Sequence, residues 1–126
     1  MKLSRTALAL WACLPGSTLP MQAALRWEHE LIAVKAEPTQ KVLRVDYRFQ
    51  NVGDRPVTLV TLEASCRCVA PEIAKTTYAP GEKGDLVMAF TVGHQTGFQE
   101  KSVVVTTDEA QAVPVRLVLR VTLPGP

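Results

Sequence analysis

Apolar and polar residues alternate along several stretches of the chain, with the period of two that is typical of a half-buried β-strand. Between residues 43 and 50 every second residue is apolar, and the residues between them carry charged or amide side chains. The longest alternating stretch covers residues 113–123, where Pro114 belongs near the strand start or at a sheet edge because proline has no backbone donor. The predicted strands are residues 25–34, 43–50, 57–62, 86–92, 101–106 and 113–123.

Residues typical of turns separate these strands. Asn51-Val52-Gly53 and Pro80-Gly81-Glu82 are the clearest such segments, and we interpret both as turn formers. Two further loops, residues 93–97 and 107–111, are rich in glycine or in polar residues. No segment has a sustained helical period. The chain is therefore predicted to be all-β, an antiparallel β-sandwich rather than a sheet of alternating strands and helices.

The same alternation predicts the core, because a strand with one wet face must bury the other. The aromatic residues Trp27, Tyr47, Phe49 and Phe90 fall on apolar faces, so we expect them in the core and not in a ligand site. The predicted core residues are Leu43, Val45, Tyr47, Phe49, Leu59, Leu86, Met88, Phe90, Val105, Leu117, Leu119 and Val121.

The N-terminus has the pattern of a secretory signal. Lys2 and Arg5 provide a positive start, and residues 6–14 form a short apolar segment of about nine residues. Ala23 is a small residue at the expected cleavage position. We therefore predict a signal peptide over residues 1–23, followed by a single domain over residues 24–126 that is periplasmic or secreted.

The apolar segment is shorter than the roughly 18 residues that span a bilayer, so no transmembrane helix is expected. Leu10-Trp11-Ala12-Cys13 offers an alternative, since it loosely resembles a lipoprotein cleavage box with Cys13 as the lipid-anchored residue. Trp11 is bulky where such a box prefers a small residue, which favours simple secretion.

Charge excludes some partners. The chain has 14 basic and 12 acidic residues, and removing Lys2 and Arg5 leaves 12 of each, so the mature domain is formally neutral. Without a basic run, neither nucleic acid nor an anionic membrane surface is an expected partner. The sequence also lacks a nucleophile elbow, a zinc-protease motif, a phosphate loop and a C-x-x-C pair, so we expect no enzyme.

Cys66-Arg67-Cys68 is the one segment that carries distinctive chemistry. In an extended strand the two thiols would point to the same face, with Cα atoms about 6.6 Å apart. That spacing is near the upper limit for a disulfide, so a bridge would require a kink. A bridged pair could be a structural disulfide or, in so small a ring, a redox pair with an oxidising potential.

The reduced pair could instead bind a soft metal. Two thiolates on one face suit Cu(I) or Zn(II), and Arg67 beside them would favour the thiolate form. Two ligands do not complete a site, so His29 or His94 would have to join Cys66 and Cys68. The structural, metal-binding and redox readings all remain open at this point.

Several short motifs, in this order along the chain, resemble one family. They match the bacterial domain-of-unknown-function family fifteen-seventy-three, whose pattern runs F-x-N-x-G, S-C-x-C, P-G-E and V-x-T-D. The matching segments are Phe49-Gln50-Asn51-Val52-Gly53, Pro56-Val57-Thr58-Leu59, Ser65-Cys66-Arg67-Cys68-Val69, Tyr78-Ala79-Pro80-Gly81-Glu82-Lys83-Gly84, Gly97 and Lys101-Ser102-Val103-Val104-Val105-Thr106-Thr107-Asp108.

The resemblance covers roughly residues 25–123 and implies an immunoglobulin-like sandwich of seven to eight strands, related in architecture to major-sperm-protein and ASH-type domains. It implies export from a bacterial cell and no established activity. The family usually has glycine between the two cysteines, where this chain has Arg67. Because arginine resists a positive φ, we expect the disulfide to close less readily here than in a Cys-Gly-Cys segment.

These observations predict an exported, non-catalytic interaction or structural module whose partner is an unknown protein of the cell envelope. The alternative is a thiol-based module in which Cys66 and Cys68 bind Cu or Zn or exchange electrons. No other cofactor is expected.

Overall fold

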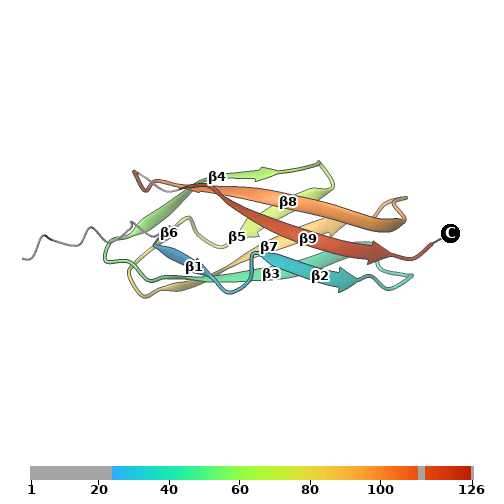
Figure 1. The fold of residues 1–126 in the computed structure, drawn as a ribbon, viewed down its shortest axis with the longest axis horizontal. Coiled ribbons are helices and arrows are strands. Elements are labelled where there is room, and N and C mark those ends of the chain that lie inside the picture. Colours follow the sequence, from blue (N-terminus) through green and yellow to red (C-terminus); the bar gives the residue numbers. More distant parts are fainter. Residues whose placement is uncertain (1–23, 111–112, 126) are drawn as a thin grey trace, which may run out of the picture.

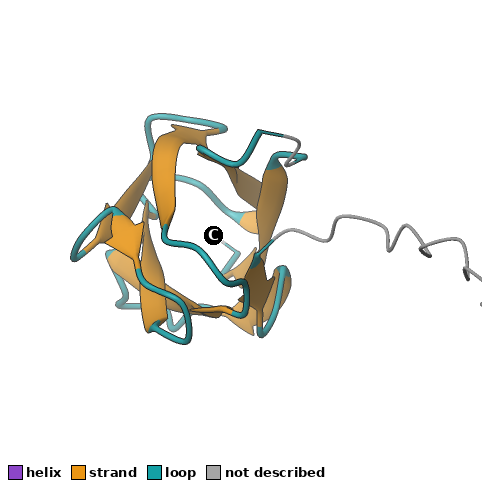
Figure 2. Cartoon of the chain, turned by 90° about the vertical axis from the view of Figure 1, so that its left-hand side faces the viewer, coloured by secondary structure: helices purple, strands orange, loops and turns teal. Residues whose placement is uncertain are grey.

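The chain folds into a sandwich of two β-sheets (Figure 1). The computed structural model describes residues 24–110 and 113–125. One sheet has the strand order β1-β3-β7-β5 and the other β2-β9-β8-β4-β6. Figure 2 looks along the sandwich and shows the strands arranged around the core, with loops closing its end. The strands are β1 (Leu25–Trp27), β2 (Leu31–Lys35), β3 (Val42–Asn51), β4 (Val57–Ala64), β5 (Val69–Ile73), β6 (Thr77–Tyr78), β7 (Lys83–Thr91), β8 (Gly97–Thr107) and β9 (Val115–Leu123).

The predicted all-β sandwich is confirmed, but the described residues form nine strands where the sequence predicts seven to eight. The predicted first strand, residues 25–34, is two strands because the chain crosses between the sheets after Trp27: β1 pairs with β3, and β2 pairs with β9. The pairing of β2 with β9 is parallel, so the sandwich is not entirely antiparallel. The short strands β5 and β6 add pairings that the alternation does not reveal.

The core lies between the two sheets and contains all twelve residues of the predicted core list, each of them at most 8% exposed, whereas Trp27, also expected there, only packs against it. Tyr47 also links the two layers, since its hydroxyl donates a hydrogen bond of 2.6 Å to the carbonyl of Val118 in the opposite sheet. Burial raises the pKa of this hydroxyl, so it stays protonated and remains a donor. Trp27 is half-buried and packs on Phe49, with ring centroids 4.8 Å apart.

One strand departs from simple alternation. Val57 and Leu59 of β4 are buried, but the register with β8 shifts between Leu59 and Thr61. Val60 is the extra residue and is 58% exposed. A β-bulge of this kind reverses the phase of the side chains, which lets Leu62 turn toward the core.

Part of the sequence-based prediction concerns residues that the structure does not describe. The signal peptide over residues 1–23 and the alternative lipid attachment at Cys13 both lie outside the described residues. Within residues 24–110 and 113–125, no helix is long and apolar enough to cross a membrane.

Candidate functional site: the Cys66–Cys68 corner

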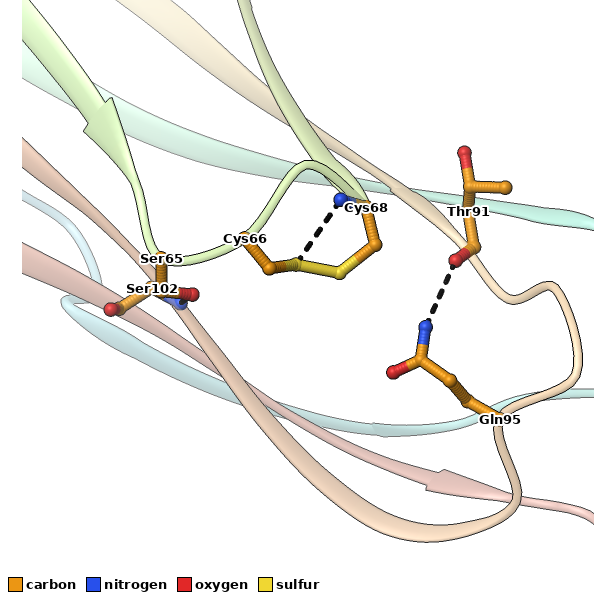
Figure 3. Close-up of a disulfide and its surroundings, with 6 residues drawn as sticks. All are labelled: Ser65, Cys66, Cys68, Thr91, Gln95 and Ser102. Carbon is orange, nitrogen blue, oxygen red and sulfur yellow. Dashed lines mark hydrogen bonds between the residues drawn. A yellow bond between two sulfur atoms is a disulfide. The ribbon is translucent and has the colours of Figure 1, made fainter.

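The two cysteines lie where the chain passes from one sheet to the other, between β4 and β5. Both sides of this passage are anchored by backbone hydrogen bonds. Ser65 N–H donates to the carbonyl of Ser102 in β8 at 2.8 Å, and the Ser65 hydroxyl accepts a bond of 3.0 Å from Ser102 N–H. On the other side, Thr91 N–H donates to the carbonyl of Cys68 at 2.8 Å. The Cys66-Arg67-Cys68 segment is thus held between β8 and β7 (Figure 3).

The structure joins Cys66 and Cys68 by a disulfide. Their Cα atoms are 5.3 Å apart, which is shorter than the spacing of an extended strand and well inside the range for disulfides. The segment is a turn, closed by a hydrogen bond of 3.3 Å from Val69 N–H to the Cys66 carbonyl. The segment is thus kinked and not extended, as predicted from the sequence for a bridge between these cysteines.

Arg67 fits this turn without backbone strain. No non-glycine residue in the described part of the chain has a positive φ, so Arg67 keeps an ordinary conformation. The expectation that arginine would hinder the bridge depended on a positive φ at this position. Turns such as type I have negative φ at both central residues, which removes the reason for that expectation.

The disulfide is half-buried against the core, and its two sulfurs are not equivalent. Both cysteines are half-buried, while Arg67 between them is exposed. Cys68 N–H donates toward Cys66 Sγ at 3.2 Å. A thiolate formed at Cys66 would therefore be stabilised by this hydrogen bond.

The structure does not bring the two histidines to the cysteines. His29 lies in the connection between β1 and β2, where its Nε2 atom is 3.9 Å from Glu28 Oε1. His94 lies in the turn after β7. No group of three or more His, Cys, Asp or Glu residues among the described residues could hold a metal ion. In the disulfide neither sulfur is a thiolate, so metal binding at Cys66 and Cys68 would first require reduction.

Apart from the Cys66–Cys68 corner, the described residues form a groove of about 680 Å³ over β1, β3 and β7. Its charged lining residues have both signs, Arg26, Arg48 and Lys83 against Glu28 and Asp85. Arg48 and Asp85 lie 3.8 Å apart and partly neutralise each other. The groove therefore has no strong preference for an anionic or a cationic ligand.

The sequence matches the family described as "Protein of unknown function (DUF1573)" over residues 25–123. The chain belongs to this family. The family resemblance stated from the motifs is confirmed. No curated protein matches the sequence of this DUF1573 chain.

Solved structures show what the DUF1573 fold is similar to. A protein of unknown function from Porphyromonas gingivalis W83 has a TM-score of 0.68 at 14% identity, covering 82% of this chain and 50% of that chain. The chain thus spans about half the length of that relative. The periplasmic chaperone SfaE has a TM-score of 0.59 at 13% identity, covering 80% of this chain and 58% of that chain.

A third similar structure is SSP-19 of Caenorhabditis elegans, titled as an MSP-domain protein like family member. Its TM-score is 0.54 at 17% identity, with 74% of this chain and 94% of that chain covered. At these identities the likeness concerns the fold alone. Together with the chaperone, SSP-19 supports the predicted immunoglobulin-like sandwich related to major-sperm-protein domains.

The polar residues of the DUF1573 motifs mostly have structural partners. Asn51 is fully buried at the end of β3. Its side-chain oxygen accepts a bond of 2.9 Å from Gly53 N–H, and its amide donates to the carbonyls of Arg55 and Tyr78 at 2.8 and 2.9 Å. Sequence reasoning treated Asn51 only as a turn former. It missed that the same amide, through its bond to Tyr78, also joins β3 to β6.

The remaining motif residues are explained in the same way. Glu82 accepts a bond of 2.9 Å from Ala79 N–H, and Asp108 accepts one of 3.0 Å from Thr58 N–H. Gly84 leaves space for two aromatic rings, because a Cβ there would lie 2.5 Å from ring atoms of Phe49 and Tyr78. The cysteines differ from these residues, since a disulfide across one residue joins no distant parts of the fold.

Proposed function

We propose that this DUF1573 domain is an exported, non-catalytic interaction module of the bacterial envelope, and that it binds an extended segment of a partner protein along β2. The observation that carries the proposal is the difference between β2 and the strands at the other ends of the two sheets. An exposed strand edge pairs readily with another chain unless something prevents it, such as shortness, proline or a bulge.

The strands at the other ends of the two sheets each have such a feature, although β3 and β8 also have unpaired edges over residues 42–47 and 97–101, beyond β1 and β4. On one sheet, β1 has three residues, and β5 carries Pro71 at its centre. On the other sheet, β6 has two residues, and the part of β4 beyond it contains the bulge at Val60. By contrast, β2 has five residues without proline or bulge.

The backbone of β2 is arranged to accept a strand. Val118 N–H donates to the carbonyl of Glu30 at 2.7 Å, and Ala36 N–H donates to the carbonyl of Thr122 at 3.0 Å. Because alternate residues of a strand bond to the same neighbour, the even-numbered residues face β9 and Ala33 directs its backbone groups away from the sheet. A partner strand there would extend the five-stranded sheet, a common mode of peptide recognition.

Substitution at Ala33 tests this proposal. Ala33→Pro removes the outward N–H and leaves the bonds between β2 and β9 in place, while the control Ala33→Ser keeps the N–H. A photoreactive residue at Lys35 should cross-link a partner in envelope preparations, and Ala33→Pro should abolish the product while Ala33→Ser does not. The same photoreactive residue at Ala70, on the opposite edge, should give no such product. Equal capture from both edges, or no effect of the proline, would refute the proposal.

The hydrogen bond from Cys68 N–H to Cys66 Sγ favours thiol–disulfide exchange as a second candidate function, because it would stabilise one leaving thiolate. In such a reaction a thiolate of a partner dithiol attacks Cys68 Sγ, the Cys66–Cys68 bond breaks, and Cys66 Sγ leaves as the thiolate held by Cys68 N–H. The partner's second thiolate then attacks the mixed disulfide and releases Cys68. The partner dithiol is oxidised to a disulfide by two electrons, and Cys66 and Cys68 are reduced to thiols.

Single-cysteine variants separate this function from a structural bridge. Mixed with an aromatic disulfide, each single-cysteine variant should form a mixed disulfide and release the aromatic thiolate. Cys68→Ser, which keeps Cys66, should react faster at neutral pH than Cys66→Ser, because the backbone N–H of residue 68 favours the thiolate at Cys66. Equal rates in the two variants would contradict the assigned roles. Adding Cu(I) or Zn(II) to the reduced wild-type protein, followed by desalting, tests the metal-binding alternative.

A further inference from the structure

Ala24, the residue before β1, is held by two separate parts of the sandwich, the β8–β9 connection and the turn after β3. Its backbone N–H donates a hydrogen bond of 3.0 Å to Glu109 Oε2. Its carbonyl accepts a bond of 2.7 Å from Val52 N–H. Its methyl group lies so close to Gly53 that a Cβ on the glycine would be only 2.8 Å away. The backbone nitrogen of Ala24 therefore has a fixed position facing a carboxylate.

Glu109 is unusual among the acidic residues of the domain. It is half-buried in the connection between β8 and β9, and Thr107 Oγ1 donates to its other oxygen at 3.2 Å. The other carboxylates that bond to a side chain across the fold, Glu72, Glu82 and Glu100, do so with lysine or arginine. Glu109 forms no ion pair within the described residues. A partly desolvated carboxylate is stabilised most by a positive partner, which a neutral amide N–H does not provide.

Cleavage after residue 23 would supply this positive partner. Hydrolysis of the peptide bond before Ala24 consumes one water and leaves a carboxylate on residue 23 and an amino group on Ala24. An α-amino group has an ordinary pKa of about 7.7–8.0, so it is mainly an ammonium ion at neutral pH. The atom that becomes charged is the nitrogen that already lies 3.0 Å from Glu109.

We propose that Glu109 is the binding site for the α-ammonium group of the mature protein, so that removal of the leader creates a new ion pair that fastens β1 to the β8–β9 connection. The proposal depends on the predicted cleavage before Ala24. Before cleavage, Glu109 accepts from Ala24 only the hydrogen bond of a neutral amide N–H, and the ion pair forms only in the mature protein. The ion pair also explains why a three-residue edge strand such as β1 is held at the residue that precedes it.

Two forms of the same mature sequence test this proposal. The chain starting at Ala24 is prepared with a free amino group and with an Nα-acetyl group, which restores a neutral amide. We expect acetylation to lower the folding equilibrium constant by about tenfold, as for the loss of a charge-assisted hydrogen bond. Glu109→Gln should cause a similar loss in the free-amine form and a much smaller one in the acetylated form.

The control is Glu63→Gln, which changes an exposed glutamate in β4 and should affect both forms equally. Equal losses from Glu109→Gln in the two forms would overturn the proposal. If that variant fails to fold, comparison of the free and acetylated wild-type chains decides the matter. Mass spectrometry of the protein from its native envelope tests the cleavage separately, and a mature start other than Ala24 would also overturn the proposal.

Discussion

Replacing Asn51 by alanine tests whether this buried amide stabilises the end of the sandwich. The side chain is 0% exposed and makes hydrogen bonds to Gly53, Arg55 and Tyr78. Three hydrogen bonds at about 1 kcal/mol each give a loss of about 3 kcal/mol. The bond to Tyr78 is buried, and leaving its carbonyl without a partner adds about 1 kcal/mol. The expected loss in the free energy of unfolding is therefore about 4 kcal/mol.

A loss of this size is large for a domain of about 100 residues, whose total stability is typically about 5–15 kcal/mol. It should lower Tm by about 16–32 °C, at roughly 4–8 °C per kcal/mol. Guanidinium unfolding followed by the fluorescence of Trp27 measures the free energy directly. Trp27 is a suitable probe because it is half-buried and packs on Phe49.

The neighbouring amide Gln50 provides a matched control. Its side chain makes one exposed hydrogen bond, of 3.2 Å to the carbonyl of Gly81, so Gln50→Ala should cost no more than about 1 kcal/mol. If Asn51→Ala were as stable as Gln50→Ala, the stabilising role assigned to the buried amide would be wrong.

Three further substitutions have expected outcomes. Gly84→Ala should cost about 1–3 kcal/mol in a thermal melt because its methyl would overlap two aromatic rings; unchanged Tm would mean that the rings move freely. The Cys66→Ser/Cys68→Ser double variant should lose only about 1.5 kcal/mol, since a three-residue loop restricts the unfolded chain little; failure to fold would contradict this. The hydrogen bond from Lys75 lowers the pKa of the Glu82 carboxyl, so its stabilisation is present above the ordinary value of 4.5 and is lost as pH falls through the lowered pKa. Lys75→Met should weaken this acid dependence in unfolding curves between pH 6 and 2, and an unchanged curve would exclude the pair.

Period-two alternation predicted the core because a half-buried strand has apolar side chains at every second position, and this pattern is visible within the strand's own sequence. In β3 and β9 every predicted position is buried, including Tyr47 and Leu119 at 0% exposure. The bulge in β4 is also visible afterwards, since Val57 and Leu59 are followed by Leu62 in the opposite phase. In contrast, nothing between Trp27 and Leu31 indicates that the chain changes sheets, because both halves carry apolar residues.

The candidate site was only partly predictable for a related reason. The sequence identified Cys66 and Cys68, but their spacing depends on a turn whose ends are fixed by β7 and β8. Likewise, Asn51 resembles a turn residue locally, and its burial depends on Tyr78, 27 residues away. The pairing of Ala24 with Glu109 spans 85 residues and has no local signal. Interactions of this kind become visible only when distant strands are brought together.

The parallel pairing of β2 with β9 has a mechanical consequence. Both strands run toward the same end of the sandwich, the end where Leu123 pairs with Gly97, while Ala24 lies at the opposite end beside Val52. Tension applied between the two ends of the domain would pull β2 and β9 in opposite directions along their length. Their hydrogen bonds would then be loaded in shear and resist the force together, instead of opening one after another. A domain connected in this way resists stretching between a surface and whatever is attached to its far end.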